Sequence, residues 1–303
     1  MDVFVLAVFI LVYLGMILGG LPGLALDRTG VAVLGAIALL AAGRVSPGEA
    51  WGAIDVSTIG LLFGLMIVSA QFRLGGFYAR VARRIAAAQV RPTTLLALLV
   101  AASGLLSAIL ANDIVCLAMT PLMIEGCARR GLNPLPYLLG LACASNVGSA
   151  ATLIGNPQNM LIGQALNLSF GGYLLDGGIP ALIGLVMVWT VIAWQHRGKW
   201  RCETELPPVE APPFDSWQTG KAIAVTAALM AAFLLAPWPR DIVGLTAAGI
   251  LLLSRRMATR TLLALVDWPL LVLFFGLFVV NHALEAADVL DRLYSASSAI
   301  HVM

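Results

Sequence analysis

The sequence predicts an all-α polytopic membrane protein, and three observations support this prediction. Hydrophobic residues make up 60% of the 303 residues and charged residues only 11%. The mean hydropathy of +0.93 is far above the range of soluble domains. Apolar runs of roughly 20 residues, enough to cross a hydrocarbon core of about 30 Å, recur along the chain. Polar residues interrupt two of these runs at positions where lipid would require hydrocarbon.

The expected elements follow one another in the order of a multi-pass protein. They are spans at about 3–21, 30–43 and 55–71, an arginine-rich arm at about 74–90, a re-entrant hairpin at 93–128, a broken helix at 135–167, a span at 178–195, a Pro-rich polar loop at 196–216, spans at 218–236, 241–254 and 267–283, and a short acidic helix at the end. The first span follows Asp2, with no basic n-region or small-residue cleavage site, so we expect it to be retained.

The two polar interruptions depart from ordinary membrane helices. The first is Ala111-Asn112-Asp113, and the second runs from Ser145-Asn146-Val147-Gly148 to Gly155-Asn156-Pro157-Gln158-Asn159. Backbone exposed to lipid finds no water to bond, so irregular polar chain at membrane depth is tolerated only where protein buries it or where it lines a cavity. Secondary transporters build their substrate and ion sites from such broken helices.

An internal repeat relates the two halves of the chain without a gap. A shift of 212 residues places Asp55 on Asp267 and Gly64 on Gly276. The same shift matches Leu61 with Leu273, Phe63 with Phe275, Leu65 with Leu277 and Arg28 with Arg240. Two apolar helices can share Leu, Phe and Gly by chance. Here the aspartate, the Phe-Gly-Leu run and the arginine of the preceding loop all match under the same shift, which favours a duplication. The predicted domains are a first repeat at 1–195, a cytoplasmic loop at 196–216 and a partial second repeat at 217–303.

The positions of the basic residues predict the membrane topology. With the arm at 74–90 placed in the cytoplasm, fifteen Lys and Arg residues lie on that side and only Arg44, Arg240 and Arg292 on the other. This is a strong positive-inside bias, and it puts the N-terminus outside and the 196–216 loop inside. Arg83 and Arg84 are interpreted as topological anchors rather than ligands. The equivalent arm of the second half, with Glu285 and its acidic neighbours, then lies outside, as an inverted-topology repeat requires.

The segments SGLLSAILANDIVCLAMTPLMIE (103–125) and ASNVGSAATLIGNPQNMLIG (144–163) resemble the paired signatures of the ion transporter superfamily. That group includes citrate permeases, arsenite permeases, NhaD-type sodium–proton antiporters and divalent-anion symporters. The resemblance implies an inverted-repeat secondary transporter, in which each repeat supplies one re-entrant hairpin and one broken helix to a central site. The order of spans fits this pattern over the whole chain.

The chain departs from the pattern in its second half. The position 212 residues after the start of the hairpin at 93 lies beyond Met303, so the second repeat is incomplete. Either the product is truncated or the second half of the site comes from elsewhere, and we expect truncation.

The candidate substrate- and ion-binding residues come from the two interruptions. They are Asn112, Asp113, Ser145, Asn146, Gly148, Thr152, Gly155, Asn156, Pro157 and Asn159. Asp113 is expected to bind a proton or Na⁺, because a charged side chain at membrane depth is energetically costly and usually marks a functional site. The alternative for Asn112 or Asp113 is an N-cap of the returning helix. Amide and hydroxyl groups serve either a cation or an anion, and a structural hydrogen bond across the break is an equal alternative for each of them. No metal centre is predicted, although Asn112, Asp113 and Asn146 form an alternative Na⁺ site.

These features predict a secondary active transporter of a small anion, citrate- or dicarboxylate-like or inorganic, coupled to H⁺ or Na⁺. An arsenite permease and a Na⁺/H⁺ antiporter are the alternatives, and an inactive truncated membrane fragment is the alternative of another class. An intramembrane enzyme is not expected, because the spans lack paired acids, a Ser–His couple and an HExxH motif. We expect no cofactor beyond the coupling ion and no nucleic-acid partner. The expected partners are the small anion and the lipid bilayer of the inner membrane, with a homodimer left open.

Overall fold

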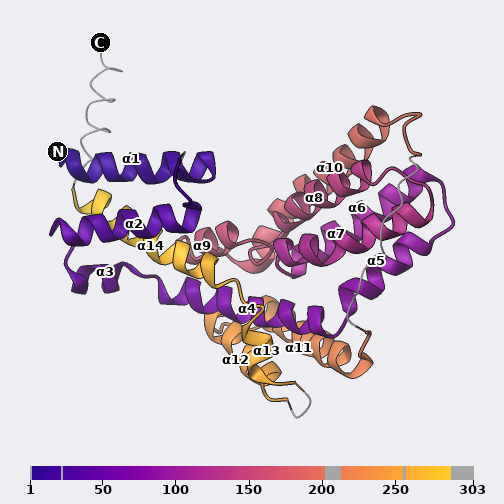
Figure 1. The fold of residues 1–303 in the computed structure, drawn as a ribbon. Coiled ribbons are helices and arrows are strands. Elements are labelled where there is room, and N and C mark those ends of the chain that lie inside the picture. Colours follow the sequence, from indigo (N-terminus) through magenta and orange to yellow (C-terminus); the bar gives the residue numbers. More distant parts are fainter. Residues whose placement is uncertain (1, 22, 202–212, 255–256, 288–303) are drawn as a thin grey trace. The chain divides into compact units, whose positions relative to one another are not determined.

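The computed structural model describes all residues except 1, 22, 202–212, 255–256 and 288–303. The described residues form α-helices and no β-strand, and they divide into two compact units (Figure 1). Unit 1 comprises residues 1–59 and 267–303, and unit 2 comprises residues 60–266. The predicted all-α, multi-pass fold class is therefore confirmed.

The helices of unit 1 are α1 (Val3–Leu18), α2 (Arg28–Ala41), α3 (Pro47–Ala53) and α14 (Trp268–Ala286). Those of unit 2 are α4 (Val56–Leu74), which begins at the boundary, α5 (Phe77–Ala87), α6 (Pro92–Ile109), α7 (Asn112–Arg129), α8 (Leu135–Ser149), α9 (Pro157–Ala165), α10 (Phe170–Gln195), α11 (Ser216–Leu235), α12 (Arg240–Leu252) and α13 (Thr259–Leu263). Among these, α4, α6, α10, α11 and α14 are long and apolar enough to cross a membrane, and α1 and α2 are shorter apolar helices.

Side chains at the predicted caps start several of these helices. Asp55 accepts a hydrogen bond from Thr58 N at 3.1 Å, and Asp267 accepts one from Leu270 N at 3.0 Å. Each satisfies a backbone donor that has no partner within its own helix. The two bonds are equivalent under the 212-residue shift. The interpretation of both acids as helix caps is thus confirmed.

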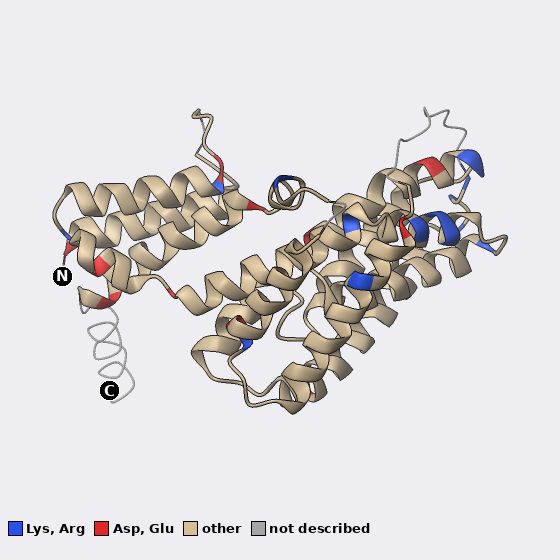
Figure 2. Ribbon diagram, turned by 90° about the horizontal axis from the view of Figure 1, so that it is seen from below, with Lys and Arg blue, Asp and Glu red and all other residues tan. Residues whose placement is uncertain are grey.

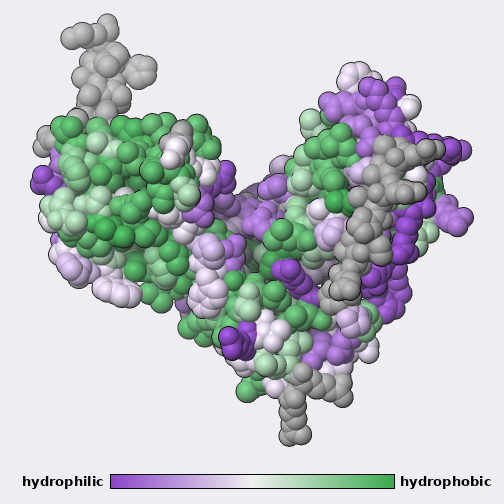
Figure 3. All heavy atoms as spheres, viewed as in Figure 1, coloured by the Kyte–Doolittle hydropathy of each residue, from purple (hydrophilic) through white to green (hydrophobic). Residues whose placement is uncertain are grey.

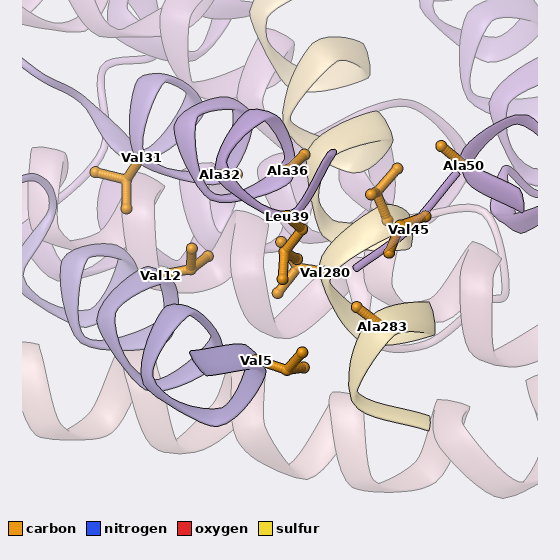
Figure 4. Close-up of a cluster of buried hydrophobic side chains, with 11 residues drawn as sticks. Val5, Val12, Val31, Ala32, Ala36, Leu39, Val45, Ala50, Val280 and Ala283 are labelled. Carbon is orange, nitrogen blue, oxygen red and sulfur yellow. The ribbon is translucent and has the colours of Figure 1, made fainter. Parts of the chain in front are cut away.

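Aliphatic side chains and one close helix crossing hold unit 1 together. Val5, Val12, Leu39, Val280 and other buried aliphatic residues form its core between α1, α2 and α14 (Figure 4). A Cβ atom on Gly276 of α14 would lie 2.8 Å from the carbonyl of Ala32 on α2, so the two helix backbones are nearly in contact. In a membrane, where lipid is as apolar as leucine, such close backbone packing is a main source of helix association. Apolar side chains also cover the outward surface of α1 and α2 (Figure 3).

Unit 2 contains the equivalent helix crossing. A Cβ atom on Gly64 of α4 would lie 2.6 Å from the carbonyl carbon and oxygen of Gly244 on α12. Gly64 and Gly276 are related by the 212-residue shift, and so are Ala32 and Gly244. In addition, α12, α13 and α14 each begin 212 residues after α2, α3 and α4. In unit 1, α2 of the first predicted repeat packs against α14 of the second, and in unit 2, α12 of the second repeat packs against α4 of the first. The boundaries of the compact units therefore differ from those of the predicted repeats.

Hydrogen bonds to backbone groups connect the loops that flank α5, follow α7, follow α10 and precede α11, and these loops lie at one end of unit 2. Asp215 N donates to Gly75 O at 3.0 Å, and Asn133 N donates to Trp200 O at 2.9 Å. Arg130 donates to the carbonyl oxygens of Ala86, Ala88 and Val90. The charge count assigns all of these loops to one side of the membrane, and the structure brings them together. Lys and Arg residues concentrate at this end (Figure 2).

The structure corrects one expected boundary and adds two short helices. The span predicted at 178–195 begins at Phe170, because Ser169 caps α10 and the helix continues through Pro180. The short helices α3 and α13 were not predicted, because seven and five residues are too few to show a period. Most of the predicted acidic helix at the end, together with Arg292, lies outside the described residues.

Candidate functional site

The two predicted helix interruptions are present, and they form the centre of the candidate site. The chain leaves α6 after Ile109 and starts α7 at Asn112. It leaves α8 after Ser149 and starts α9 at Pro157, so residues 144–163 are not one continuous helix. Both interruptions lie in unit 2.

The two interruptions meet. Asn112 Nδ2 donates to Asn146 Oδ1 at 3.4 Å, and Thr152 Oγ1 donates to the carbonyl of Ala108 at 2.6 Å. The second bond satisfies a carbonyl at the end of α6, where helical partners run out. The prediction that the tip of the hairpin approaches the broken helix is therefore confirmed.

One buried polar group at this meeting point lacks a partner. Asn112 is 7% exposed, and its Oδ1 makes no hydrogen bond within the part of the chain that the structure describes. A buried amide oxygen without a partner costs roughly 1–3 kcal/mol. Asp113 and Asn146, beside it on α7 and α8, are exposed. The orphan oxygen and these two exposed side chains make the junction a candidate ligand site.

A second group of predicted residues bonds within the break itself. Asn156 Oδ1 accepts from Asn159 N at 2.8 Å and so caps α9, while Asn156 Nδ2 donates to Ser149 Oγ at 3.1 Å. Asn159 Nδ2 donates to Thr152 O at 2.9 Å. These bonds satisfy the backbone of the irregular segment. For Asn156, Asn159 and Thr152, the structure therefore shows the structural alternative that the sequence left open.

The two glycines and the proline shape the break. Gly148 lies inside α8, not in the irregular loop, and a Cβ atom there would collide with the backbone of Gly104 on α6. A Cβ atom on Gly155 would collide with the carbonyl of Ser149, which the chain passes as it turns back. Pro157 is the first residue of α9, where its missing N–H costs nothing. The two glycines allow close backbone approach, and none of the three residues offers a side-chain ligand.

The two helix starts differ in their caps. Asn156 caps α9, whereas α7 follows Ala111 with no side-chain cap among the described residues. The interpretation of Asn112 or Asp113 as the cap of α7 is therefore wrong: both lie inside the first turn. The uncapped start of α7 carries the partial positive charge of a helix N-terminus. Of the two helix starts at the interruptions, only that of α7 has no side-chain cap among the described residues.

Sequence reasoning missed two residues at the junction. Ser69 Oγ on α4 accepts a hydrogen bond from Ala111 N at 3.2 Å and so ties the tip of the hairpin to a neighbouring helix. Cys116 Sγ lies 2.8 Å from Ser145 Oγ, and Ser145 is fully buried. Ser69 and Gln71 are polar interruptions of an otherwise apolar span, and this signal could have marked them. No cluster of three or more His, Cys, Asp or Glu side chains occurs among the described residues.

Apolar helices of membrane-spanning length and polar breaks that meet between them define a multi-pass membrane protein of the transporter class. The chain belongs to the citrate transporter family, whose profile matches residues 4–303.

Three relatives illustrate its range. The chain is 31% identical to a 46 kDa membrane protein of Mycobacterium leprae over 82% of its length and 60% of the relative. It is 32% identical to the inner membrane protein YbiR of Escherichia coli over 80% of its length and 63% of the relative. It is 35% identical to the silicon efflux transporter LSI3 of rice over 54% of its length and 33% of the relative. The chain thus spans between one third and two thirds of these proteins.

Proposed function

We propose that this chain contributes one half of the binding site of a secondary active transporter for a small anion, coupled to H⁺ or Na⁺. The observation that carries this proposal is the junction of Asn112 and Asn146. Among the described residues, a buried amide oxygen there has no hydrogen-bond partner, and the adjacent start of α7 has no side-chain cap. Membership of the citrate transporter family supports a carboxylate such as citrate as the substrate.

The charges at the junction provide a physical basis for ion coupling. The N-terminus of α7 favours an anion, but Asp113 in its first turn opposes one. A bound proton or Na⁺ would neutralise Asp113 and remove this repulsion. The orphan Oδ1 of Asn112 and the amide oxygen of Asn146 are the hard oxygen ligands that Na⁺ accepts. In this mechanism the cation binds first and the anion follows, so the two bind cooperatively.

The other half of the site is assigned to the second repeat. Under the 212-residue shift, the equivalents of Asn112 and Asn146 fall beyond Met303. An inverted-repeat transport cycle needs a mobile element from each repeat, so we propose that groups of the second repeat complete the site that the junction begins.

A second candidate substrate is an uncharged hydroxide of silicon or arsenic. Relatives named as a silicon efflux transporter and as a putative transporter arsB support this alternative. The observation that favours it is the neutral character of Asn112, Ser145 and Asn146, which suits hydroxyl groups. A Na⁺/H⁺ antiporter is the alternative if Asp113 alone carries the transported ions.

Ligand binding to the purified chain tests the proposal. Citrate, sulfate and arsenite are added with Na⁺ or with choline at several pH values, and ligand-induced thermal stabilisation is measured. Asn112→Leu and Asn146→Leu should each weaken anion binding about tenfold, which corresponds to about 1.4 kcal/mol. Asp113→Asn should abolish the dependence on Na⁺ or on pH. Gln195→Leu, an exposed amide at the end of α10, should bind like the wild type.

Two results would contradict the proposal. Unchanged affinity in both asparagine variants would exclude the junction as the anion site. Anion affinity that depends on neither Na⁺ nor pH in the wild type would refute the assignment of the coupling ion to Asp113. Stabilisation by arsenite alone, independent of the cation, would favour the uncharged substrate.

A further inference from the structure

Helix α5 carries its positive charges on one face. Its buried face consists of small or apolar residues and one tyrosine, namely Tyr78, Ala79, Ala82, Ile85 and Ala86, and it packs against α7. Its opposite face exposes Arg80, Arg83 and Arg84. Because the apolar face is already covered by protein, burial of apolar surface does not explain the basic face. Polar side chains gather over α5 (Figure 3).

A hollow of about 860 Å³ lies between α5 and α7. Its polar lining comes from Arg83 and Gln89 on one side and from Glu125, Arg129 and Arg130 on the other. We name this feature the arginine hollow. A second, smaller hollow beside it is lined by Arg80, Arg83 and Arg84, so Arg83 borders both.

The arginine hollow has an excess of positive charge. Arg129 forms an ion pair with Glu125 at 2.6 Å, and this is the only ion pair of the arginine hollow between described residues. Arg130 donates to the carbonyl oxygens of Ala86, Ala88 and Val90, which position its guanidinium but do not neutralise it. Arg83 has no carboxylate within 4.0 Å in the described part of the chain. Three guanidinium groups thus face one carboxylate.

Aromatic residues mark the depth of this surface. Trp217, Trp194 and Phe214 are exposed at the same end of unit 2, and tryptophan at such positions is typical of the boundary between hydrocarbon and headgroups. The guanidinium of Arg80 lies 4.1 Å from the ring centroid of Phe214. The basic face of α5 therefore lies beside an exposed aromatic residue of the kind that is enriched at the headgroup level of membrane proteins.

We infer that the arginine hollow binds the headgroup phosphate of an anionic phospholipid in the leaflet that α5 faces. Guanidinium groups bind phosphate oxygens through two parallel hydrogen bonds, which distinguishes a built site from diffuse surface charge. Basic pockets between membrane helices on the cytoplasmic side recognise such headgroups. Arg83 and Arg129 supply the outer contacts, and Arg130, fixed by three carbonyl groups, supplies the inner one. Because α7 begins at Asn112, the lipid would contact the far end of the helix that starts at the transport junction.

Lipid retention by the purified 303-residue chain tests this inference. The chain is placed in nanodiscs of phosphatidylcholine with or without phosphatidylglycerol, and the bound lipid is counted by native mass spectrometry. We expect selective, salt-sensitive retention of phosphatidylglycerol. Each of Arg83→Gln and Arg129→Gln should weaken it about fivefold, and the double variant roughly twentyfold or more. Arg197→Gln removes an exposed charge at the same end but outside the hollow, and it should retain the lipid.

Each remaining outcome decides the question. Equal losses in Arg197→Gln and in the hollow variants would show diffuse charge and overturn the inference. Inorganic phosphate that displaces the lipid at equal concentration would identify a site for soluble anions, which also overturns it. Arg83→Lys with Arg129→Lys keeps the charge but loses the planar fork, so it should recover part of the binding. Circular dichroism of every variant separates loss of lipid binding from loss of fold. If a glutamine variant does not fold, the double lysine variant replaces it. Lipid retention by the double lysine variant equal to that of the wild type would contradict a site specific for guanidinium groups.

Discussion

The two equivalent helix crossings allow a quantitative test. Gly64 meets the backbone of Gly244, and Gly276 meets the backbone of Ala32. A Cβ atom at these glycines would lie 2.6 and 2.8 Å from backbone atoms, whereas ordinary contact begins near 3.4 Å. Alanine at either position therefore requires the two helices to separate by about 0.6–0.8 Å, because backbone atoms cannot rotate away as a side chain can.

The expected cost follows from this displacement. Overpacking of a close-packed contact costs about 1–3 kcal/mol. Alanine recovers about 0.5–1 kcal/mol of helix propensity, so we expect Gly64→Ala and Gly276→Ala to lower the free energy of unfolding by about 1–2 kcal/mol each. The thermal midpoint should fall by about 2–4 °C for each kcal/mol. Intrinsic tryptophan fluorescence in detergent measures it.

Matched controls make the test specific. Gly220 on α11 and Gly249 on α12 are also helical, but a Cβ atom there has nothing within 4 Å. Gly220→Ala and Gly249→Ala should raise the midpoint, because only the propensity gain remains. If Gly64→Ala were as stable as Gly249→Ala, the close backbone crossing would be refuted. A strong effect at Gly64 with none at Gly276 would contradict the equivalence of the two crossings.

Three further predictions concern the junction and the topology. Ser69→Ala should leave Ala111 N without its acceptor and cost about 1–3 kcal/mol in thermal unfolding, whereas Ser57→Ala in the first turn of α4 should cost less than half as much. Asn156→Ala should lose the cap of α9 and cost about 0.5–2 kcal/mol, while Asn156→Asp keeps the capping oxygen and should recover part of it; equal losses in both variants would argue against the cap. Cysteines at Ser216 and Ser298, in a background without exposed native thiols, should react with impermeant reagents from opposite sides of the membrane, and labelling from one side would contradict the inverted repeat.

The sequence by itself determined the fold class and the positions of the long helices, with the exception of the start of α10. Hydropathy depends only on local composition, and Asp55 and Asp267 cap the first turn of the helix that follows each of them. Both the membrane helices and these caps can therefore be predicted from local sequence. The start of α10 was misplaced because Gly177, Gly178 and Pro180 resemble a loop, while packing of the helix tolerates them. The 212-residue register likewise needs only the order of residues.

Only the tertiary structure decided which polar residues are structural and which remain open. Asn112, Asn146, Asn156 and Asn159 are the same residue type in similar surroundings, and no local pattern distinguishes them. Asn156 and Asn159 find partners across the break, whereas the Oδ1 of Asn112 finds none in the part of the chain that the structure describes. The difference arises because hydrogen bonding depends on distances between segments that fold together. The role of Ser69 was hidden for the same reason, since its partner, Ala111, lies 42 residues along the chain. Sequence fixes the chemistry of each group, but the packing of helices decides which groups are left for a ligand.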